Sequence, residues 1–305
     1  MVMTTENPNK LIVPEEKDLI SVNGDILIPL KELLSNTQEF SDWELQRKAE
    51  LEEMLHTAGG ISGVHLIWGD LGSGKSMYMY YLAFEARKYF NMGTIVDSAC
   101  LTPLYGEAEL MLDEDFVIDQ EKLSRLVKLY KKFDKIQDLD WENSGVKFYR
   151  KAVCWDEAYS KISVQQTSDN LARAYNHATL QYRHNGCIIM IVSPDASQIN
   201  RQYANKFATH AVHCTRRENY MGSGELYCLY DIDNLKTKQS YRRILKASKW
   251  GQLFKTEGII PPKISLAKNK KVNLTEEDNN EIDEWLKQKE RELTKKYTNV
   301  IEQEG

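Results

Sequence analysis

The sequence predicts an α/β fold, in which a mostly parallel sheet is covered by helices on both faces. Three observations predict this fold. Short apolar runs indicate buried strands, helical segments alternate with them, and a glycine-rich loop joins one strand to one helix. Strands that alternate with helices favour parallel βαβ units. The chain has 305 residues, of which 42% are hydrophobic, so it can build the core that such a fold needs.

Each element is predicted from its local pattern. Residues 41–57 begin with a capping Ser41 or Asp42 and predict a helix that stops at "AGG". The apolar run "GVHLIW" predicts a buried strand at 63–68, and "MYMYYLAFEARKYF" predicts a helix at 77–90. Further strands are expected at 93–99, 151–158, 187–193, 209–215 and 225–232, and further helices at 119–139, up to about 181, and after 274.

The pattern divides the chain into three parts. Residues 1–57 form an N-terminal segment with a helix, and 58–266 form the core, with an insertion at about 101–150. Residues 267–305 form a charged C-terminal helical tail, for which a solvated surface helix is the expected state.

Composition narrows the class of protein. The net charge of −5 argues against a wholly basic nucleic-acid coat, although a local basic face stays open. Five cysteines without a C-x-x-C pair favour free thiols in a reducing compartment. The start resembles no signal peptide, and the longest apolar run is too short to span a bilayer. We therefore expect a cytoplasmic protein without membrane insertion.

The stretch "GDLGSGKS" at 69–76, here called the P-loop, fits the phosphate-binding pattern G-x-x-x-x-G-K-[ST]. Its glycines allow backbone N–H groups to face an anion at a helix N-terminus. Lys75 would reach the β- and γ-phosphates, and the Ser76 hydroxyl would bind Mg²⁺. A glycine turn that caps an ordinary helix is the alternative. The predicted nucleotide-binding residues are Gly69, Asp70, Leu71, Gly72, Ser73, Gly74, Lys75 and Ser76.

A second motif, "AVCWDE" at 152–157, places two acids at the carboxyl end of a buried strand. Ligands of open α/β sheets bind at that edge. Asp156 would hold Mg²⁺ through its water shell, and Glu157 would orient and polarise the attacking water. An adjacent Asp-Glu pair is typical of NTPases that hydrolyse rapidly to drive motion. The alternative is a strand-end turn with two solvated acids.

The strand "CIIMIVS" ends in polar residues that could contact the γ-phosphate. Ser193 is the first candidate for this sensing role, and Gln198 follows a few residues later. A turn built around Pro194 and Asp195 is the alternative.

An arginine could complete the site of a neighbouring subunit by stabilising transition-state charge. Arg183, in "QYRHNG" just before the strand at 187–193, is the candidate. Arg216 and Arg217 compete for this role, and a plain surface arginine near a helix end is the alternative for Arg183.

The order of these motifs resembles the FtsK/HerA superfamily of P-loop ATPases, and most closely viral DNA-packaging ATPases and Zot-like proteins. The resemblance rests on "GDLGSGKS", "AVCWDEA", "RHNG" and "IIMIVSPDASQIN", with "WGQLFKTEGIIPP" as a closing segment, and spans roughly 60–262. It departs from the family at Pro194, where the family has a glutamine. The strand end "IVSPD" also resembles the coupling motif of phage terminase ATPases.

This resemblance implies a RecA-like core that binds ATP and Mg²⁺ and assembles as a homo-oligomeric ring, usually of six subunits. It implies double-stranded DNA as the partner, moved through a central pore. A viral member of the family would act in the host cytoplasm and would meet a capsid or recruiting protein.

A locally basic segment agrees with a DNA partner. Residues 201–250 contain ten Lys or Arg and four Asp or Glu. They could line a surface that follows DNA phosphates, or form a solvated mixed face. The residues in question are Arg201, Lys206, Arg216, Arg217, Lys236, Lys238, Arg242 and Arg243.

Other functions stay open beside a DNA translocase. A non-motor regulatory P-loop ATPase, or a small-molecule kinase, would not need DNA. A terminase-like packaging ATPase would have to lack its nuclease domain, since only about forty residues follow position 265. A guanine-reading N-K-x-D motif is absent from the sequence, which argues against a GTPase switch.

Overall fold

The computed structural model describes residues 40–57, 60–97, 108–140, 144–158, 162, 170–199, 206–217, 224–254 and 274–303. Most of the expected N-terminal segment therefore lies outside the described residues, as do Arg201 and the end of the closing segment after Phe254. Among the helices that the structure describes, none combines the length and the apolar composition that a membrane span requires.

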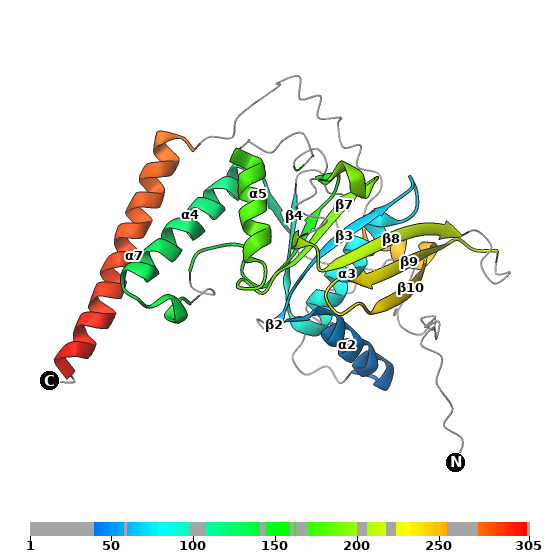
Figure 1. Cartoon of the computed structure of the whole chain (residues 1–305), viewed down its shortest axis with the longest axis horizontal. Coiled ribbons are helices and arrows are strands. Elements are labelled where there is room, and N and C mark those ends of the chain that lie inside the picture. Colours follow the sequence, from blue (N-terminus) through cyan, green and yellow to red (C-terminus); the bar gives the residue numbers. More distant parts are fainter. Residues whose placement is uncertain are drawn as a thin grey trace, which may run out of the picture.

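Within the described residues, eight strands form one sheet in the order β10-β9-β8-β3-β7-β6-β4-β5 (Figure 1). The six strands from β8 to β5 run parallel, and β9 and β10 extend this sheet in antiparallel fashion. The strands are β3 (Gly63–Gly69), β4 (Gly93–Asp97), β5 (Ala108–Met111), β6 (Lys151–Trp155), β7 (Ile188–Ser193), β8 (His210–Arg217), β9 (Tyr227–Asn234) and β10 (Ser240–Lys246). A separate short pair joins β1 (His56–Thr57) to β2 (Gly60–Ile61).

The strand order positions the two predicted motifs. The P-loop strand β3 lies between β8 and β7, and the acidic strand β6 lies on the far side of β7. Trp68 of β3 pairs with Ser193, and Trp155 of β6 pairs with Ile191. All three strands therefore end at the same edge, with the P-loop and Asp156 one strand apart. The predicted α/β fold with a mostly parallel sheet is confirmed.

Side chains alternate between the two faces of each strand. Both faces of this sheet carry buried apolar residues, and helices cover both. Ile67 packs into a core with α2 (Asp42–Leu55) and α3 (Lys75–Phe90). Its neighbour Leu66 packs into a second core with α4 (Asp113–Lys132) and α5 (Asn170–Gln181). Helix α3 is buried almost all round, which explains its unusual wealth of tyrosine and methionine.

Helix α2 begins as the sequence predicts and is fixed to α3 by a buried ion pair. Ser41 and Glu44 form a reciprocal capping box at its start. Further along, the Arg47 guanidinium donates to both carboxylate oxygens of Glu85, with Nε and Nη2 each at 2.6 Å. Burial alone would lower the pKa of Arg47, but the attraction of Glu85 outweighs it and raises that pKa. Arg47 therefore stays charged inside the protein.

Helix α7 (Glu276–Gln303) runs alongside α4, farther from the sheet (Figure 1). Thr275 caps α7, since its hydroxyl accepts from the backbone N–H of Asp278 at 3.1 Å. The two helices share ion pairs such as Lys132–Glu290 at 2.6 Å, and Ile282 is fully buried. The sequence predicts a solvated surface helix here, yet some of the charged side chains of α7 form ion pairs with α4.

In the main sheet and the helix that follows β5, strands β5 and β10 and the start of α4 differ from the sequence-based expectation. Strand β5 lies in the acidic stretch 107–119 and pairs with β4, so the segment expected as an insertion adds an edge strand to the main sheet. Helix α4 begins at Asp113 rather than near 119, because three acids in its first turn suit a helix N-terminus. Strand β10 was not expected, since its sequence "SYRRILK" contains two arginines.

The buried ion pair predicts a large stability loss when one partner is removed. Glu85→Ala should lower the free energy of unfolding by about 3–5 kcal/mol, because it leaves the buried Arg47 charge with Glu50, at 3.2 Å, as its remaining acidic partner among the described residues. Lys132→Ala is the matched control, since it breaks the exposed pair with Glu290 and should cost under about 1 kcal/mol. Urea denaturation measures both. Equal small losses would show that Arg47 does not depend on Glu85.

Candidate nucleotide-binding site

The P-loop connects the end of β3 to the start of α3, and two of its glycines are required by space as well as by conformation. A Cβ on Gly69 would lie 2.3 Å from the carbonyl oxygen of Cys214. A Cβ on Gly74 would lie 2.6 Å from the Tyr230 hydroxyl oxygen and 2.7 Å from Cys228 Sγ. Gly74 also has a left-handed φ of +89° as the residue before α3. The loop therefore lies tightly against β8 and β9.

Lys75 is folded over this loop. Its Nζ donates to the backbone carbonyl of Gly69 at 2.8 Å and to that of Asp70 at 2.9 Å. These bonds hold the ammonium group at the mouth of the loop. The N-terminus of α3 adds partial positive charge at the same point. The arrangement suits a bound phosphate chain.

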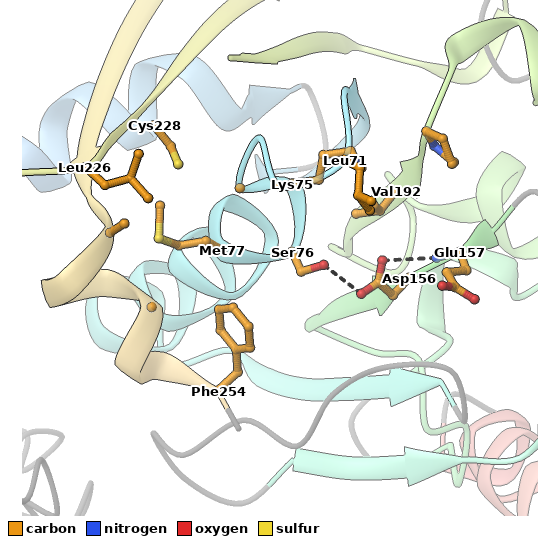
Figure 2. Close-up of a pocket in the computed structure, with 15 residues that line it drawn as sticks. Leu71, Lys75, Ser76, Met77, Asp156, Glu157, Val192, Leu226, Cys228 and Phe254 are labelled. Carbon is orange, nitrogen blue, oxygen red and sulfur yellow. Dashed lines mark hydrogen bonds between the residues drawn. The ribbon is translucent and has the colours of Figure 1, made fainter. Parts of the chain in front are cut away.

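The two predicted Mg²⁺ ligands touch one another. The Ser76 hydroxyl donates to Asp156 Oδ2 at 2.8 Å, across 80 residues of sequence (Figure 2). The backbone N–H of Glu157 donates to the other oxygen, Asp156 Oδ1, at 3.0 Å. Glu157 adopts a left-handed φ of +48°, and its exposed carboxylate lines the cavity beside Asp156. Hydroxyl and carboxylate oxygens are suitable Mg²⁺ ligands, so these residues fit the ion.

The Asp156 carboxyl is strongly affected by its surroundings. Burial raises its pKa to about 6, against the hydrogen bonds from Ser76 and from the Glu157 backbone, which lower it. The nearby carboxylate of Asp97, at the end of β4, raises it further. A buried carboxyl with an elevated pKa is typical of functional sites, where a cation completes the charge balance.

A cavity of about 460 Å³ extends from these residues (Figure 2). Its polar end holds Lys75, Ser76, Asp156 and Glu157. Its other end is apolar and is built by α3, the start of β9 and the turn of α6 (Ala247–Trp250) that follows β10. This apolar end, here called the base wall, consists of Met77, Leu226, Cys228, Ala247, Gly251 and Phe254. Its size and polarity suit a nucleoside attached to a phosphate chain.

The predicted γ-phosphate sensors do not line this cavity. The Ser193 hydroxyl is buried and donates to the backbone carbonyl of Asp195 at 2.8 Å. Gln198 is exposed in the short turn of 3₁₀-helix after β7. Pro194 does line the cavity, and its side chain offers no hydrogen-bond donor. The sensing role of Ser193 and Gln198 stays a prediction without support from their placement.

Arg183 lies at the opposite edge of the sheet from the P-loop. It is exposed in the turn between α5 and β7, just before that strand begins at Ile188. The five residue steps from Ile188 to Ser193 span about 17 Å. Arg183 therefore does not contact the nucleotide site of its own chain, and its predicted role requires a second subunit.

The expected basic surface is divided and partly neutralised. Arg216 and Arg217 end β8 at the P-loop edge, whereas Lys236 and Lys238 lie in the turn after β9, at the opposite edge. Two other arginines are paired: Arg242 with Asp231 at 2.6 Å and Arg243, which is buried, with Glu50 at 3.3 Å. The described part of the 201–250 segment thus does not form one continuous basic track.

Sequence reasoning missed the base wall and Asp97. The base wall comes from three separate segments that meet only in the folded chain. Gly251 and Phe254, within the closing segment "WGQLFKTEG", are its two members with a signal in the sequence. Asp97 ends "GTIVD", and the carboxyl end of a buried strand is the signal that could have found it.

The elevated pKa of Asp156 predicts a pH-dependent stability difference. The folded state holds a proton on this carboxyl up to about pH 6, whereas an unfolded aspartate loses it near pH 4. This group's contribution to stability is therefore lost as pH rises through about 6. Asp156→Asn should raise the free energy of unfolding of nucleotide-free protein by on the order of 2 kcal/mol at pH 8, and by much less at pH 5. Thermal unfolding at both pH values measures this, and an equal gain at both would contradict it.

Comparisons with known proteins show likeness only to solved structures. No protein-family model matches the chain, and no curated protein matches it. The genome packaging NTPase of Sulfolobus turreted icosahedral virus 2, in complex with ATP-gammaS, aligns at 15% identity with a TM-score of 0.38, over 60% of this chain and 96% of the other. A KaiC-like protein of Pyrococcus horikoshii aligns at 10% identity with a TM-score of 0.36, over 61% and 90%. At these values, the likenesses assign no family to the chain.

Proposed function

We propose that this protein is a Mg²⁺-dependent ATPase that works as a ring-forming DNA translocase, in the manner of a viral genome-packaging motor. One observation carries the proposal: the 2.8 Å bond from Ser76 to Asp156, with Glu157 beside it at the mouth of the cavity. This pair joins the P-loop to the acidic strand. It supplies the parts that phosphoryl transfer needs at one end of a cavity with room for a nucleoside.

The residues divide the chemistry between them. The P-loop backbone and Lys75 bind and orient the phosphate chain. Ser76 and Asp156 would hold Mg²⁺, which neutralises charge on the β- and γ-phosphates when bound. Glu157, which lines the polar end of the cavity, would accept a proton from the attacking water. The apolar base wall excludes water from the nucleoside end.

Two features support an assembly in which a neighbour completes the site. Leu71, at the tip of the P-loop, is 100% exposed although it borders the cavity. A large apolar side chain at such a place is a suitable contact for another subunit. Arg183 lies exposed at the opposite edge of the sheet, where a ring could present it to the next cavity. The DNA partner, preferably double-stranded, and a capsid or recruiting protein follow from the motif resemblance.

A non-motor regulatory ATPase is the second candidate. The pairing of Arg242 and Arg243 favours it, because it removes two of the cations expected to follow DNA phosphates. Lys246 is likewise paired, with Glu225 at 2.7 Å. Such an enzyme would keep the same nucleotide chemistry, and its turnover would not respond to DNA.

The assigned roles predict different losses for two substitutions. Lys75→Ala should abolish nucleotide binding, whereas Glu157→Gln should bind Mg²⁺-ATP and hydrolyse it at least about a hundredfold more slowly, the scale of lost general-base catalysis. Nucleotide binding and phosphate release measure the two effects. Glu109→Gln, which alters an exposed acid outside this cavity, is the matched control and should leave turnover unchanged. Undiminished hydrolysis by Lys75→Ala would remove the ATPase assignment.

The ring proposal predicts complementation between variants. Arg183→Ala should bind ATP but lose hydrolysis, and mixing it with Glu157→Gln should restore part of the activity, because some interfaces regain both groups. Arg291→Ala, an exposed arginine on α7, is the control and should retain full activity. Double-stranded DNA should raise turnover, and added salt should remove that stimulation by screening phosphate contacts. A protein that stays monomeric, and whose turnover ignores DNA, would instead support the regulatory ATPase.

A further inference from the structure

Arg216 occupies a defined place at the P-loop edge of the sheet. Side chains alternate along β8, and Val212 and Cys214 both lie in the core on the α3 side. Arg216 is the next residue of this series. It pairs in register with Cys228 of β9, and residues paired across antiparallel strands project from the same face. Since Cys228 belongs to the base wall, Arg216 extends on the face where the cavity lies.

The guanidinium of Arg216 lies against the P-loop itself. A Cβ placed on Gly72 would be 3.7 Å from Arg216 Nη1, which is ordinary van der Waals distance. The charge also acts on the base wall. Burial raises the pKa of the Cys228 thiol, and the Arg216 guanidinium lowers it in part. Arg216 does not line the cavity; it borders Gly72 and Cys228, which do.

We propose that Arg216 binds the phosphate chain of the nucleotide within its own subunit. This inference rests on the proposed function, since it needs a nucleotide at the P-loop. A guanidinium has several N–H donors in a fixed fork, which matches phosphate oxygens and stays charged at all physiological pH values. Arg216 thereby adds a second cation to Lys75 and approaches the P-loop from the opposite side to Asp156.

The position of Arg216 on β8 determines which phosphates of the nucleotide it contacts. Arg216 lies on β8, between the P-loop strand and β9, which carries part of the base wall. Asp156 and Glu157, where the γ-phosphate reacts, follow β6, two strands away from β3 on its other side. The α- and β-phosphates are therefore the groups that Arg216 contacts. The residue contributes to the binding of ATP and ADP alike and is not a sensor of the γ-phosphate.

Arg217 provides a matched control from the adjacent position. It is exposed, as Arg216 is, but its side chain projects from the opposite face of β8, and its backbone lies in register with Tyr227. Removing it changes the net charge by the same amount at nearly the same place. A general electrostatic attraction for nucleotide would treat the two arginines alike, whereas a direct contact distinguishes them.

The experiment measures the affinity of the full chain for Mg²⁺-ATP and Mg²⁺-ADP by titration calorimetry. Arg216→Ala should weaken both about tenfold to a hundredfold, the scale of a lost charge-assisted hydrogen bond. Arg216→Lys should fall between this variant and the wild type, and Arg217→Ala should change affinity less than about twofold. Because Arg216 is exposed, the melting temperature without nucleotide should not change, while the stabilisation by nucleotide should shrink.

The outcomes separate this inference from the proposed function. If Lys75→Ala abolishes ATP binding while Arg216→Ala binds as Arg217→Ala does, the Arg216 contact is wrong and the ATPase assignment stands. A loss confined to ATP, with ADP unaffected, would also overturn the contact with the α- and β-phosphates. If the wild-type protein binds neither nucleotide, the proposed function itself fails.

Discussion

The contact between Ser76 and Asp156 requires that β3 and β6 end at the same edge of the sheet, and the strand order meets this requirement. Strands β3 and β6 are not neighbours, because β7 lies between them, so their axes are about 10 Å apart. The P-loop turns back at the end of β3, and α3 begins directly after it at Lys75. The first turn of α3 then brings Ser76 within 2.8 Å of the residue that follows β6. The polar end of the cavity, where Ser76, Asp156 and Glu157 meet, follows from this crossing.

Much of the fold could be predicted because its signals are local. The strand at β3, the P-loop and α3 follow one another without a break, and each shows its own pattern in the sequence. Asp156 was placed correctly because a carboxylate after an apolar run of four lies at the end of a buried strand. The ends of parallel strands share one edge, so its position at the same edge as the P-loop could also be predicted.

The features that could not be predicted depend on distant partners. Arg243 resembles a solvated cation in the sequence, yet it is buried because Glu50, 193 residues away, provides its counter-charge. This pairing also concealed β10, since two arginines in seven residues do not resemble a strand. The placement of Arg183 at the far edge depends on the path of α5 across the sheet, which no local pattern reveals.

The close packing around Gly74 has a consequence for how this sequence can evolve. Because the Cys228 sulfur and the Tyr230 hydroxyl fill the space where a Cβ at position 74 would lie, the three positions are sterically one unit. A larger side chain at position 228 would clash with the P-loop backbone, just as a side chain at position 74 would clash with Cys228. The Tyr230 hydroxyl also donates to the Gly74 carbonyl at 3.0 Å. Among descendants of this chain, changes at positions 74, 228 and 230 should therefore be inherited together, even though Tyr230 lies 156 residues beyond Gly74.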